Sequence, residues 1–267
     1  MVTISTKSDM RRVYATPFCY HCGRGFLDST PRTRDHVPSR AAFSAVDLTE
    51  CPLILPAHES CNNSNTSTDK RMGQLVSLRH GSRRRRRKLE SHLRAAAGPD
   101  GKVLCAMVGV DLKKAIWRWI RAFHAALYGE FLPDTPHCSV LPPLPAAHPA
   151  GGRMVPTPIL PQYELFAELI KQSRNVGRLD SIRAFGSRLR YDCVWITAGD
   201  GRLVCVFALD LYGWSGLGSP NWGRQRCCMG HYLAPQGLPT NASHNPAKIA
   251  LPLPACSPLD AFEEADS

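Results

Sequence analysis

Two pairs of metal-binding residue types stand in the first quarter of the chain at the same spacing. Cys19 and Cys22 are separated by two residues and followed by Gly23, and His58 and Cys61 repeat the separation further along. Thiolates and imidazoles are ligands that zinc prefers, and the spacing is typical of a zinc knuckle, whose tight turn brings two side chains to one ion. The sequence therefore predicts a tetrahedral Cys3His site that holds a structural zinc ion.

Cys51 is a competing fourth ligand, but it has no partner at knuckle spacing. The chain holds eleven cysteines, an odd number, and its first residues, MVTISTKSDMRR, lack the apolar run of a secretory signal. We therefore expect metal binding rather than disulfides for the clustered cysteines. The other seven are expected to be mostly reduced, buried small hydrophobes.

Asp35 and His36 lie between the two pairs, in the stretch TRDHVPSR, and Asn62 directly follows the last predicted zinc ligand. An imidazole with a pKa near ~6.5 can accept a proton from water, and carboxylate oxygens can hold a hard divalent cation. An ordinary polar turn explains the same residues, with Asp35 capping the turn before Pro38 and the asparagines capping a helix. The spacing alone leaves both interpretations open.

The motifs CxxCG, DHVP and LPAHxxCNN, in this order, resemble the zinc-knuckle type of HNH endonuclease, whose fold is a ββα-metal unit. DHVPSRAAF and LILPAHESCNNSNTSTD are similar to a group of bacterial HNH-like proteins with a longer C-terminal part. This resemblance covers residues 18–69; IWRWIRAFHAALYGEFLP and SRLRYDCVW also resemble the group, less specifically.

The resemblance implies a metal-dependent nuclease that hydrolyses phosphodiester bonds in DNA, with double-stranded DNA as the expected partner. His36 is implied as the general base. Asp35 and Asn62 are implied as ligands of a catalytic divalent metal, Mg²⁺ or a similar ion, separate from the structural zinc. A homodimer, which would cut both strands, is compatible with this family.

The sequence departs from the family pattern at Pro52-Leu53, where an Asn that orients the catalytic histidine loop is expected. Asn63 and Asn65 are nearby candidates to replace it. A zinc-stabilised module that binds nucleic acid without cleaving it is therefore the alternative to the enzyme. A third hypothesis is that the C-terminal region binds a partner or small ligand and uses the HNH module as its effector.

Positive charge is concentrated in the first third of the chain. Residues 1–94 hold 17 Lys and Arg against 8 Asp and Glu, whereas residues 95–267 hold 16 against 14. The segment SRRRRRKLESHLR, from Ser82 to Arg94, is expected to form a basic helix. Guanidinium groups pair well with phosphates, so we expect this run to bind nucleic-acid backbone with little sequence preference, although a solvated face or a nuclear-localisation signal would also account for it. The predicted nucleic-acid-binding residues are Arg83, Arg84, Arg85, Arg86, Arg87 and Lys88.

The composition, with 43% hydrophobic and 21% charged residues over 267 positions, is that of a globular protein of one or two cores. The periodicity of apolar residues predicts helices over 111–128 and 163–172, and a β-hairpin whose arms, 189–195 and 203–212, flank the turn Gly199-Asp200-Gly201. The predicted fold class is α+β, with an N-terminal ββα-metal module. The expected divisions are the module at 1–80, basic and amphipathic helices at 81–130, a Pro-rich linker or loop at 131–161, an α+β region at 162–235 and an irregular tail at 236–267.

No stretch of the sequence approaches the ~18 consecutive apolar residues of a membrane span. We therefore expect a cytoplasmic protein that does not bind a membrane. His124 and His137 lack a partner at ligand spacing, so we interpret them as incidental to the chemistry.

Overall fold

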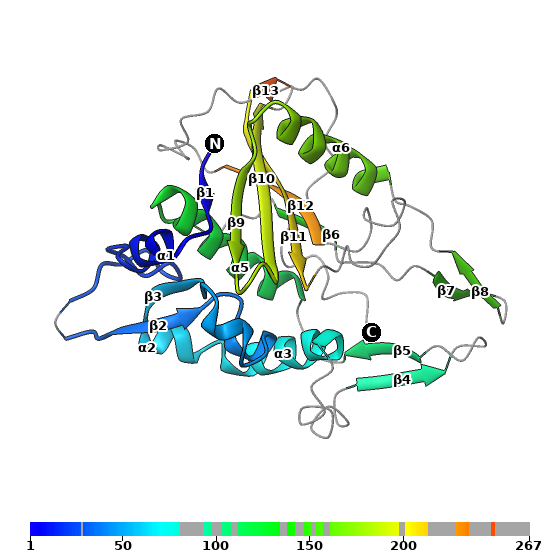
Figure 1. Cartoon of the computed structure of the whole chain (residues 1–267), viewed down its shortest axis with the longest axis horizontal. Coiled ribbons are helices and arrows are strands. Elements are labelled where there is room, and N and C mark those ends of the chain that lie inside the picture. Colours follow the sequence, from blue (N-terminus) through cyan, green and yellow to red (C-terminus); the bar gives the residue numbers. More distant parts are fainter. Residues whose placement is uncertain are drawn as a thin grey trace.

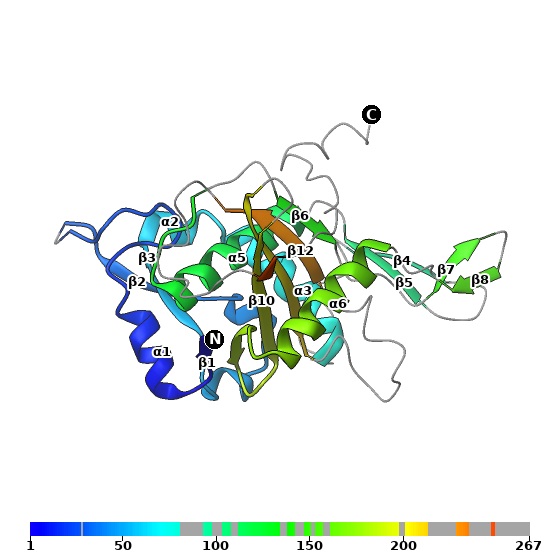
Figure 2. The ribbon, with the colours of Figure 1, turned by 90° about the horizontal axis from the view of Figure 1, so that it is seen from above.

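A computed structural model of the chain describes residues 1–27, 29–80, 93–97, 103–107, 112–133, 138–141, 147–150, 153–156, 161–197, 201–212, 228–234 and 247–248. Its largest element is a seven-stranded sheet in the order β1-β9-β10-β11-β12-β6, with β13 paired to β10 (Figure 1). The strands are β1 (Thr3–Ile4), β6 (Cys138–Leu141), β9 (Asp180–Ala184), β10 (Leu189–Thr197), β11 (Leu203–Leu211), β12 (Cys228–Leu233) and β13 (Ala247–Lys248). The helices α5 (Leu112–Tyr128) and α6 (Pro161–Asn175) cover opposite faces of this sheet (Figure 2).

The alternation of side chains along β10 explains the two layers. Tyr191, Cys193 and Trp195 pack with α5 in the larger hydrophobic core, whereas Val194 and Ile196 pack with α6 in the smaller one. Successive residues of a strand point to opposite faces, so a strand whose residues from Tyr191 to Ile196 are all buried must be covered on both sides. This requirement places β10 at the centre of the fold.

A smaller unit at the N-terminal end consists of two antiparallel strands followed by helix. His36 pairs with Ile54 and Arg32 with His58, so the strands run side by side over their whole length. A helix also precedes the two strands, and it begins at a capping box. There the side chains of Thr6 and Asp9 each accept a hydrogen bond from the other residue's backbone N–H. The elements of this unit are α1 (Lys7–Tyr14), β2 (Arg32–His36), the 3-10 turns η1 (Arg40–Ala42) and η2 (Asp47–Thr49), β3 (Ile54–His58), α2 (Glu59–Asn63) and α3 (Thr66–His80).

The N-terminal unit and the large sheet share one hydrophobic core. The rings of Phe43 and Phe185 are stacked with centroids 3.8 Å apart. The Tyr212 hydroxyl donates to the Asp47 carboxylate over 2.5 Å, and the Phe185 N–H donates to the Cys51 carbonyl over 3.1 Å. These contacts hold the segment between β2 and β3 against the turn between β9 and β10 and against the end of β11.

Several sequence-based predictions are confirmed. The fold is α+β, and α5 and α6 lie over the predicted helices. The two arms of the predicted hairpin are β10 and β11, paired antiparallel from Leu189 opposite Leu211 to Thr197 opposite Leu203. Among the described helices, none combines the length and apolarity that crossing a membrane requires.

Three segments differ from the predictions. The stretch 131–161 is not an irregular linker throughout, because Cys138–Leu141 form β6, which pairs with the edge of β12. Two further strands in this stretch, β7 (Ala147–Ala150) and β8 (Arg153–Pro156), pair with each other. The basic helix predicted over 82–94 lies mostly outside the described residues, and its last residue, Arg94, belongs to β4 (Leu93–Ala97), which pairs with β5 (Val103–Met107). Residues Thr3–Ile4 join the large sheet beside β9 rather than the N-terminal module.

Candidate metal centre and the Asp35-His36 strand

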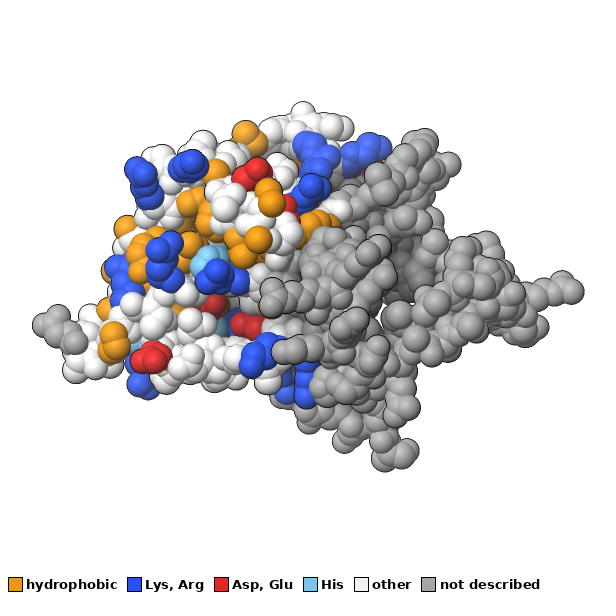
Figure 3. Space-filling view, turned by 60° about the horizontal axis from the view of Figure 1, so that its bottom comes forward, with side chains coloured by type: hydrophobic (Ala, Val, Ile, Leu, Met, Phe, Trp, Pro, Cys, Tyr) orange, Lys and Arg blue, Asp and Glu red, His pale blue; other side chains and the backbone are white. Residues whose placement is uncertain are grey.

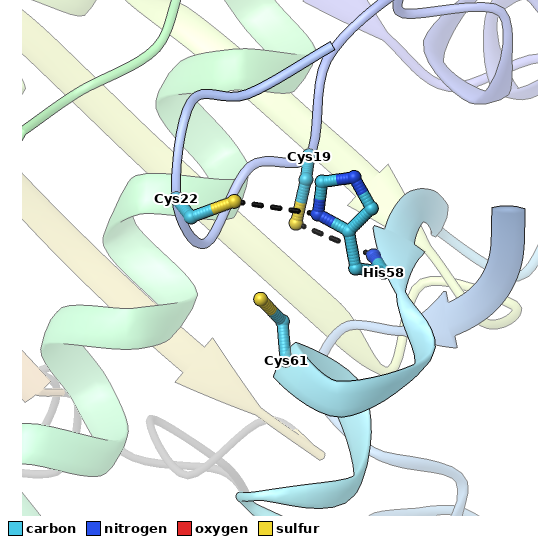
Figure 4. A group of neighbouring side chains, drawn as sticks. All are labelled: Cys19, Cys22, His58 and Cys61. Atoms are coloured by element: carbon cyan, nitrogen blue, oxygen red, sulfur yellow. Dashed lines mark hydrogen bonds between the residues drawn. The ribbon is translucent and has the colours of Figure 1, made fainter. Parts of the chain in front are cut away.

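The four predicted zinc ligands, Cys19, Cys22, His58 and Cys61, point toward a common centre (Figure 4). One ligand atom from each lies within 4.8 Å of the other three. Ligands held about 2.3 Å from a tetrahedral zinc ion are separated by about 3.8 Å, so a small contraction suffices to close the site. The cluster can therefore hold a metal ion such as zinc. The competing ligand Cys51 lies outside it.

The knuckle turn is built by backbone hydrogen bonds. The Gly23 N–H donates to the Cys19 carbonyl over 2.8 Å, and the Cys19 N–H donates to the Arg24 carbonyl over 2.9 Å. Gly23 has φ +73°, and a Cβ there would lie 2.7 Å from the Phe131 ring. Glycine is thus required twice, for the left-handed backbone and for the close approach of the ring.

A hydrogen bond to the backbone orients the His58 imidazole. Its Nε2 lies 3.2 Å from the Gly25 carbonyl oxygen, which can only accept, so the proton belongs on Nε2. Nδ1, which lies 3.4 Å from the Cys22 sulfur, is then left with its lone pair facing the centre of the cluster. An outer hydrogen bond that fixes the tautomer in this way is usual for metal-binding histidines.

The electrostatics of the cluster also favour a cation. Burial, reinforced by the neighbouring Cys19 and Cys22 sulfurs, raises the pKa of the Cys61 thiol to about 12. Three thiolates at this separation repel one another unless a positive charge lies between them. A bound metal ion supplies that charge, so metal binding and thiol deprotonation are coupled.

Asp35 lies in β2, 4% exposed, and is held by the knuckle. The Tyr20 hydroxyl donates to its Oδ2 over 2.6 Å, and the His21 Nε2 lies 3.1 Å from the same oxygen. The other oxygen, Oδ1, accepts no hydrogen bond from the described residues. Burial, together with the Asp35 charge, raises the pKa of Tyr20 far above its usual value, so the hydroxyl remains a donor.

Helix α5 supplies two arginines to the same region. The Arg118 guanidinium donates to the Asp69 carboxylate of α3, and Arg121 donates to the His21 carbonyl over 2.5 Å. Burial raises the pKa of Asp69. The positive charge of Arg118 lowers that pKa in part, and the charge of Asp35 raises it further. Arg118 is 7% exposed, and within the described part of the chain its Nε and Nη1 have no hydrogen-bond partner. A buried group of two carboxylates and one guanidinium thus lies beside the metal cluster.

His36 follows Asp35 in the strand and therefore points to the other face of β2. Burial and the charge of Arg40, with a smaller contribution from Arg34, lower the pKa of His36 to about 4. The imidazole is consequently neutral at neutral pH. The backbone beyond it is held by the Val37 N–H, which donates to the Leu53 carbonyl over 3.1 Å. Leu53 is one of the two residues found where the resemblance led us to expect an Asn, and it binds this loop through its main chain.

No hydrogen bond joins Asn62 to the other predicted catalytic residues within the described part of the chain. Asn62 lies in α2, half-buried, and in the described part of the chain its side chain makes no hydrogen bond to Asp35 or to any other residue. The nearby Asn65 donates to the Cys61 carbonyl over 3.0 Å, which fixes the helix junction rather than the loop after His36. The predicted nucleic-acid-binding run Arg83 to Lys88 lies outside the described residues.

Asp35 is surrounded by residues that were not predicted from the sequence: Tyr20, His21, Asp69 and Arg118. A signal existed for two of them. His21 stands inside the CxxC motif, and Asp69 is the sole acidic residue of α3. Arg118 gave no signal, because an arginine between two tryptophans in an amphipathic helix is ordinarily read as part of its solvated face.

A scan against protein-family models, a search of curated proteins and a search of solved structures each found no match to this chain.

Proposed function

We propose that this protein is a metal-dependent endonuclease of the HNH type that hydrolyses phosphodiester bonds in DNA. One arrangement carries the proposal: an antiparallel strand pair followed by helix, closed by a Cys3His cluster, with Asp35 and His36 at the end of its first strand. In this proposal the cluster binds a structural zinc ion that fixes the knuckle, and the knuckle in turn fixes Asp35 through Tyr20 and His21.

His36 is proposed as the general base. A neutral imidazole is the form that can accept a proton from water, and the lowered pKa keeps His36 in that form at neutral pH. The main-chain bond from Val37 to Leu53 supports this role, because it holds the histidine loop in the absence of the expected Asn.

Asp35 and Asn62 are proposed to hold a catalytic divalent ion such as Mg²⁺. The Oδ1 of Asp35, which accepts no hydrogen bond from the described residues, and the amide oxygen of Asn62 are hard ligands of the kind that Mg²⁺ prefers. Such an ion would stabilise negative charge at the scissile phosphate. Asn62 makes no competing side-chain hydrogen bond in the described structure, so its side chain can turn to a ligand.

The second candidate is a zinc-stabilised module that binds nucleic acid without cleaving it. Its support is the burial of Asp35, which is 4% exposed and already accepts from Tyr20. Such a carboxylate is engaged in the fold, and a strand that directs Asp35 and His36 to opposite faces separates the two proposed roles. The two functions share nucleic-acid binding and differ only in chemistry.

Nicking of supercoiled plasmid DNA with Mg²⁺ or Mn²⁺ distinguishes the two. We expect the wild type to nick, EDTA to stop it, and His36→Ala to lose about 100-fold or more in rate while still binding DNA. Asn62→Ala should also lose activity, whereas Ser67→Ala, at an exposed position of the next helix, should keep it. DNA binding without cleavage by the zinc-loaded wild type would favour the binding module and contradict the enzyme.

A further inference from the structure

The face of β2 that carries His36 is basic. Arg32, Arg34 and His36 occupy alternate positions of the strand, so their side chains emerge on the same face. The opposing strand, β3 (Ile54–His58), has no acidic residue with which the arginines could pair. The described part of the face seen in Figure 3 likewise shows more Lys and Arg side chains than acidic ones.

Arg32 has a structural role on this face. Its guanidinium donates to the Tyr14 carbonyl and, over 3.0 Å, to the Thr16 carbonyl. It also lies over two aromatic rings, 4.8 Å from the centroid of Tyr14 and 5.2 Å from that of Phe26. Arg32 therefore closes the C-terminal end of α1, where unpaired carbonyls favour a cation.

Arg34 and Arg40 have no comparable role. Both are exposed, and neither guanidinium donates a hydrogen bond to the described residues. The Arg34 guanidinium lies over the Tyr14 ring, 5.7 Å from its centroid. Arg40 begins η1, four residues beyond His36. The two cations thus flank the half-buried imidazole, one before it on the strand and one after it on the turn.

A solvated surface is the ordinary explanation of exposed arginines, but it does not account for this placement. Unpaired guanidinium groups beside an imidazole raise the local positive potential at a site that the fold has partly removed from water. Such an arrangement is unfavourable for a neutral partner and favourable for an anion. A phosphodiester group fits, because its two unesterified oxygens can each accept from one guanidinium.

We propose that Arg34 and Arg40 bind the backbone phosphates of a nucleic acid on either side of His36, and that the strand of nucleic acid follows β2 toward Arg32 and Tyr14. The inference deepens the proposed function, on which it rests for the identity of the anion. It assigns the backbone contacts of the site to Arg34 of β2 and Arg40 of η1. Because guanidinium–phosphate contacts carry no base information, the binding should be tolerant of sequence.

The proposal is tested by measuring the affinity of the zinc-loaded protein for two short DNA duplexes of unrelated sequence, using fluorescence anisotropy. The variants are Arg34→Ala and Arg40→Ala. The matched control is Arg178→Ala, which removes the same charge from an exposed arginine between α6 and β9 that also donates no side-chain hydrogen bond to the described residues. Circular dichroism confirms that each variant is folded.

We expect each of the two test variants to lose about tenfold in affinity for both sequences, and the slope of log affinity against log salt to flatten by about 1 per residue. Arg178→Ala should change neither. Equal affinities of all three variants and the wild type would overturn the inference, as would a loss confined to one DNA sequence. If the wild type bound DNA but did not nick plasmid, the proposed catalysis would be contradicted, whereas the comparison of DNA affinities would still test the roles of Arg34 and Arg40. The failure of the proposed function and the failure of this inference are therefore distinguishable.

Discussion

The Nε2 of His21 lies 3.1 Å from the Oδ2 of Asp35, and this contact joins the metal-binding turn to the strand of the candidate site. His21 stands between Cys19 and Cys22, so its backbone follows the geometry of the knuckle. Its carbonyl is in turn bound by Arg121 of α5. The Cys3His cluster, strand β2 and helix α5 are therefore connected through one residue.

Loss of one knuckle ligand should release the metal and loosen this connection. We expect Cys61→Ser to lose its equivalent of zinc and to unfold at a lower temperature, because three remaining ligands do not close a structural tetrahedral site. Zinc content by mass spectrometry and thermal unfolding measure both effects. Cys51→Ser is the control, since Cys51 lies outside the cluster and should keep a full equivalent. Full zinc retention in both Cys61→Ser and Cys19→Ser would contradict the ligand assignment.

The pair formed by Arg118 and Asp69 should be worth more than an exposed ion pair. Their side chains are 8% and 15% exposed, so removing the guanidinium leaves a carboxylate partly buried near Asp35 without compensation. We expect Arg118→Met to destabilise the protein by about 3 kcal/mol, measured by urea unfolding at neutral pH.

The exposed pair of Arg12 and Asp9, with Arg12 68% exposed, supplies the matched comparison. Arg12→Met should cost less than about 1 kcal/mol. In the background of Asp69→Asn, the Arg118→Met substitution should also cost much less than in the wild type, because no buried charge is then left unpaired. Equal costs in the two backgrounds would show that Arg118 acts through packing alone.

The sequence could predict those parts of the fold that depend on local patterns. The CxxC and HxxC spacings identified all four side chains that the structure brings together in the cluster, and apolar periodicity located α5, α6 and the β10–β11 hairpin. The surroundings of Asp35 could not be predicted, because Arg118 reaches Asp69 across 49 positions of the chain and its helix shows no ligand-like spacing. Likewise, β6 joins the large sheet through pairing with β12, which is distant in sequence; proline content alone indicated a linker there.

Acid should destabilise the protein through a buried histidine of the large sheet. Burial lowers the pKa of His231, which is 1% exposed, to about 4, whereas an unfolded histidine titrates near ~6.5. Between these values the unfolded state binds more protons, so stability falls as the pH decreases from about 6.5 toward 4. Between about pH 7 and pH 5 this group alone should cost roughly 2 kcal/mol.

The variant His231→Gln isolates that contribution. Its unfolding free energy should change less between neutral and mildly acid pH than that of the wild type, while other titrating groups act equally on both proteins. Urea unfolding across this pH range measures the difference. Parallel stability curves for the two proteins would assign the acid sensitivity to other groups.

Gly73 of α3 should not tolerate a side chain, although alanine is the better helix former. A Cβ at Gly73 would lie 2.3 Å from the Cβ of Ala41 and 2.6 Å from its carbonyl carbon. The gain in helix propensity is about 1 kcal/mol, whereas overpacking against backbone costs about 1–3 kcal/mol. We therefore expect Gly73→Ala to be destabilising overall, by about 1 kcal/mol or more.

Ser67→Ala, at an exposed position of the same helix, should be neutral or slightly stabilising, because it receives the propensity gain without the clash. If Gly73→Ala instead raised the free energy of unfolding in urea, α3 would not approach η1 as closely as described. Asp69, which α3 carries, would then also lie further from Asp35.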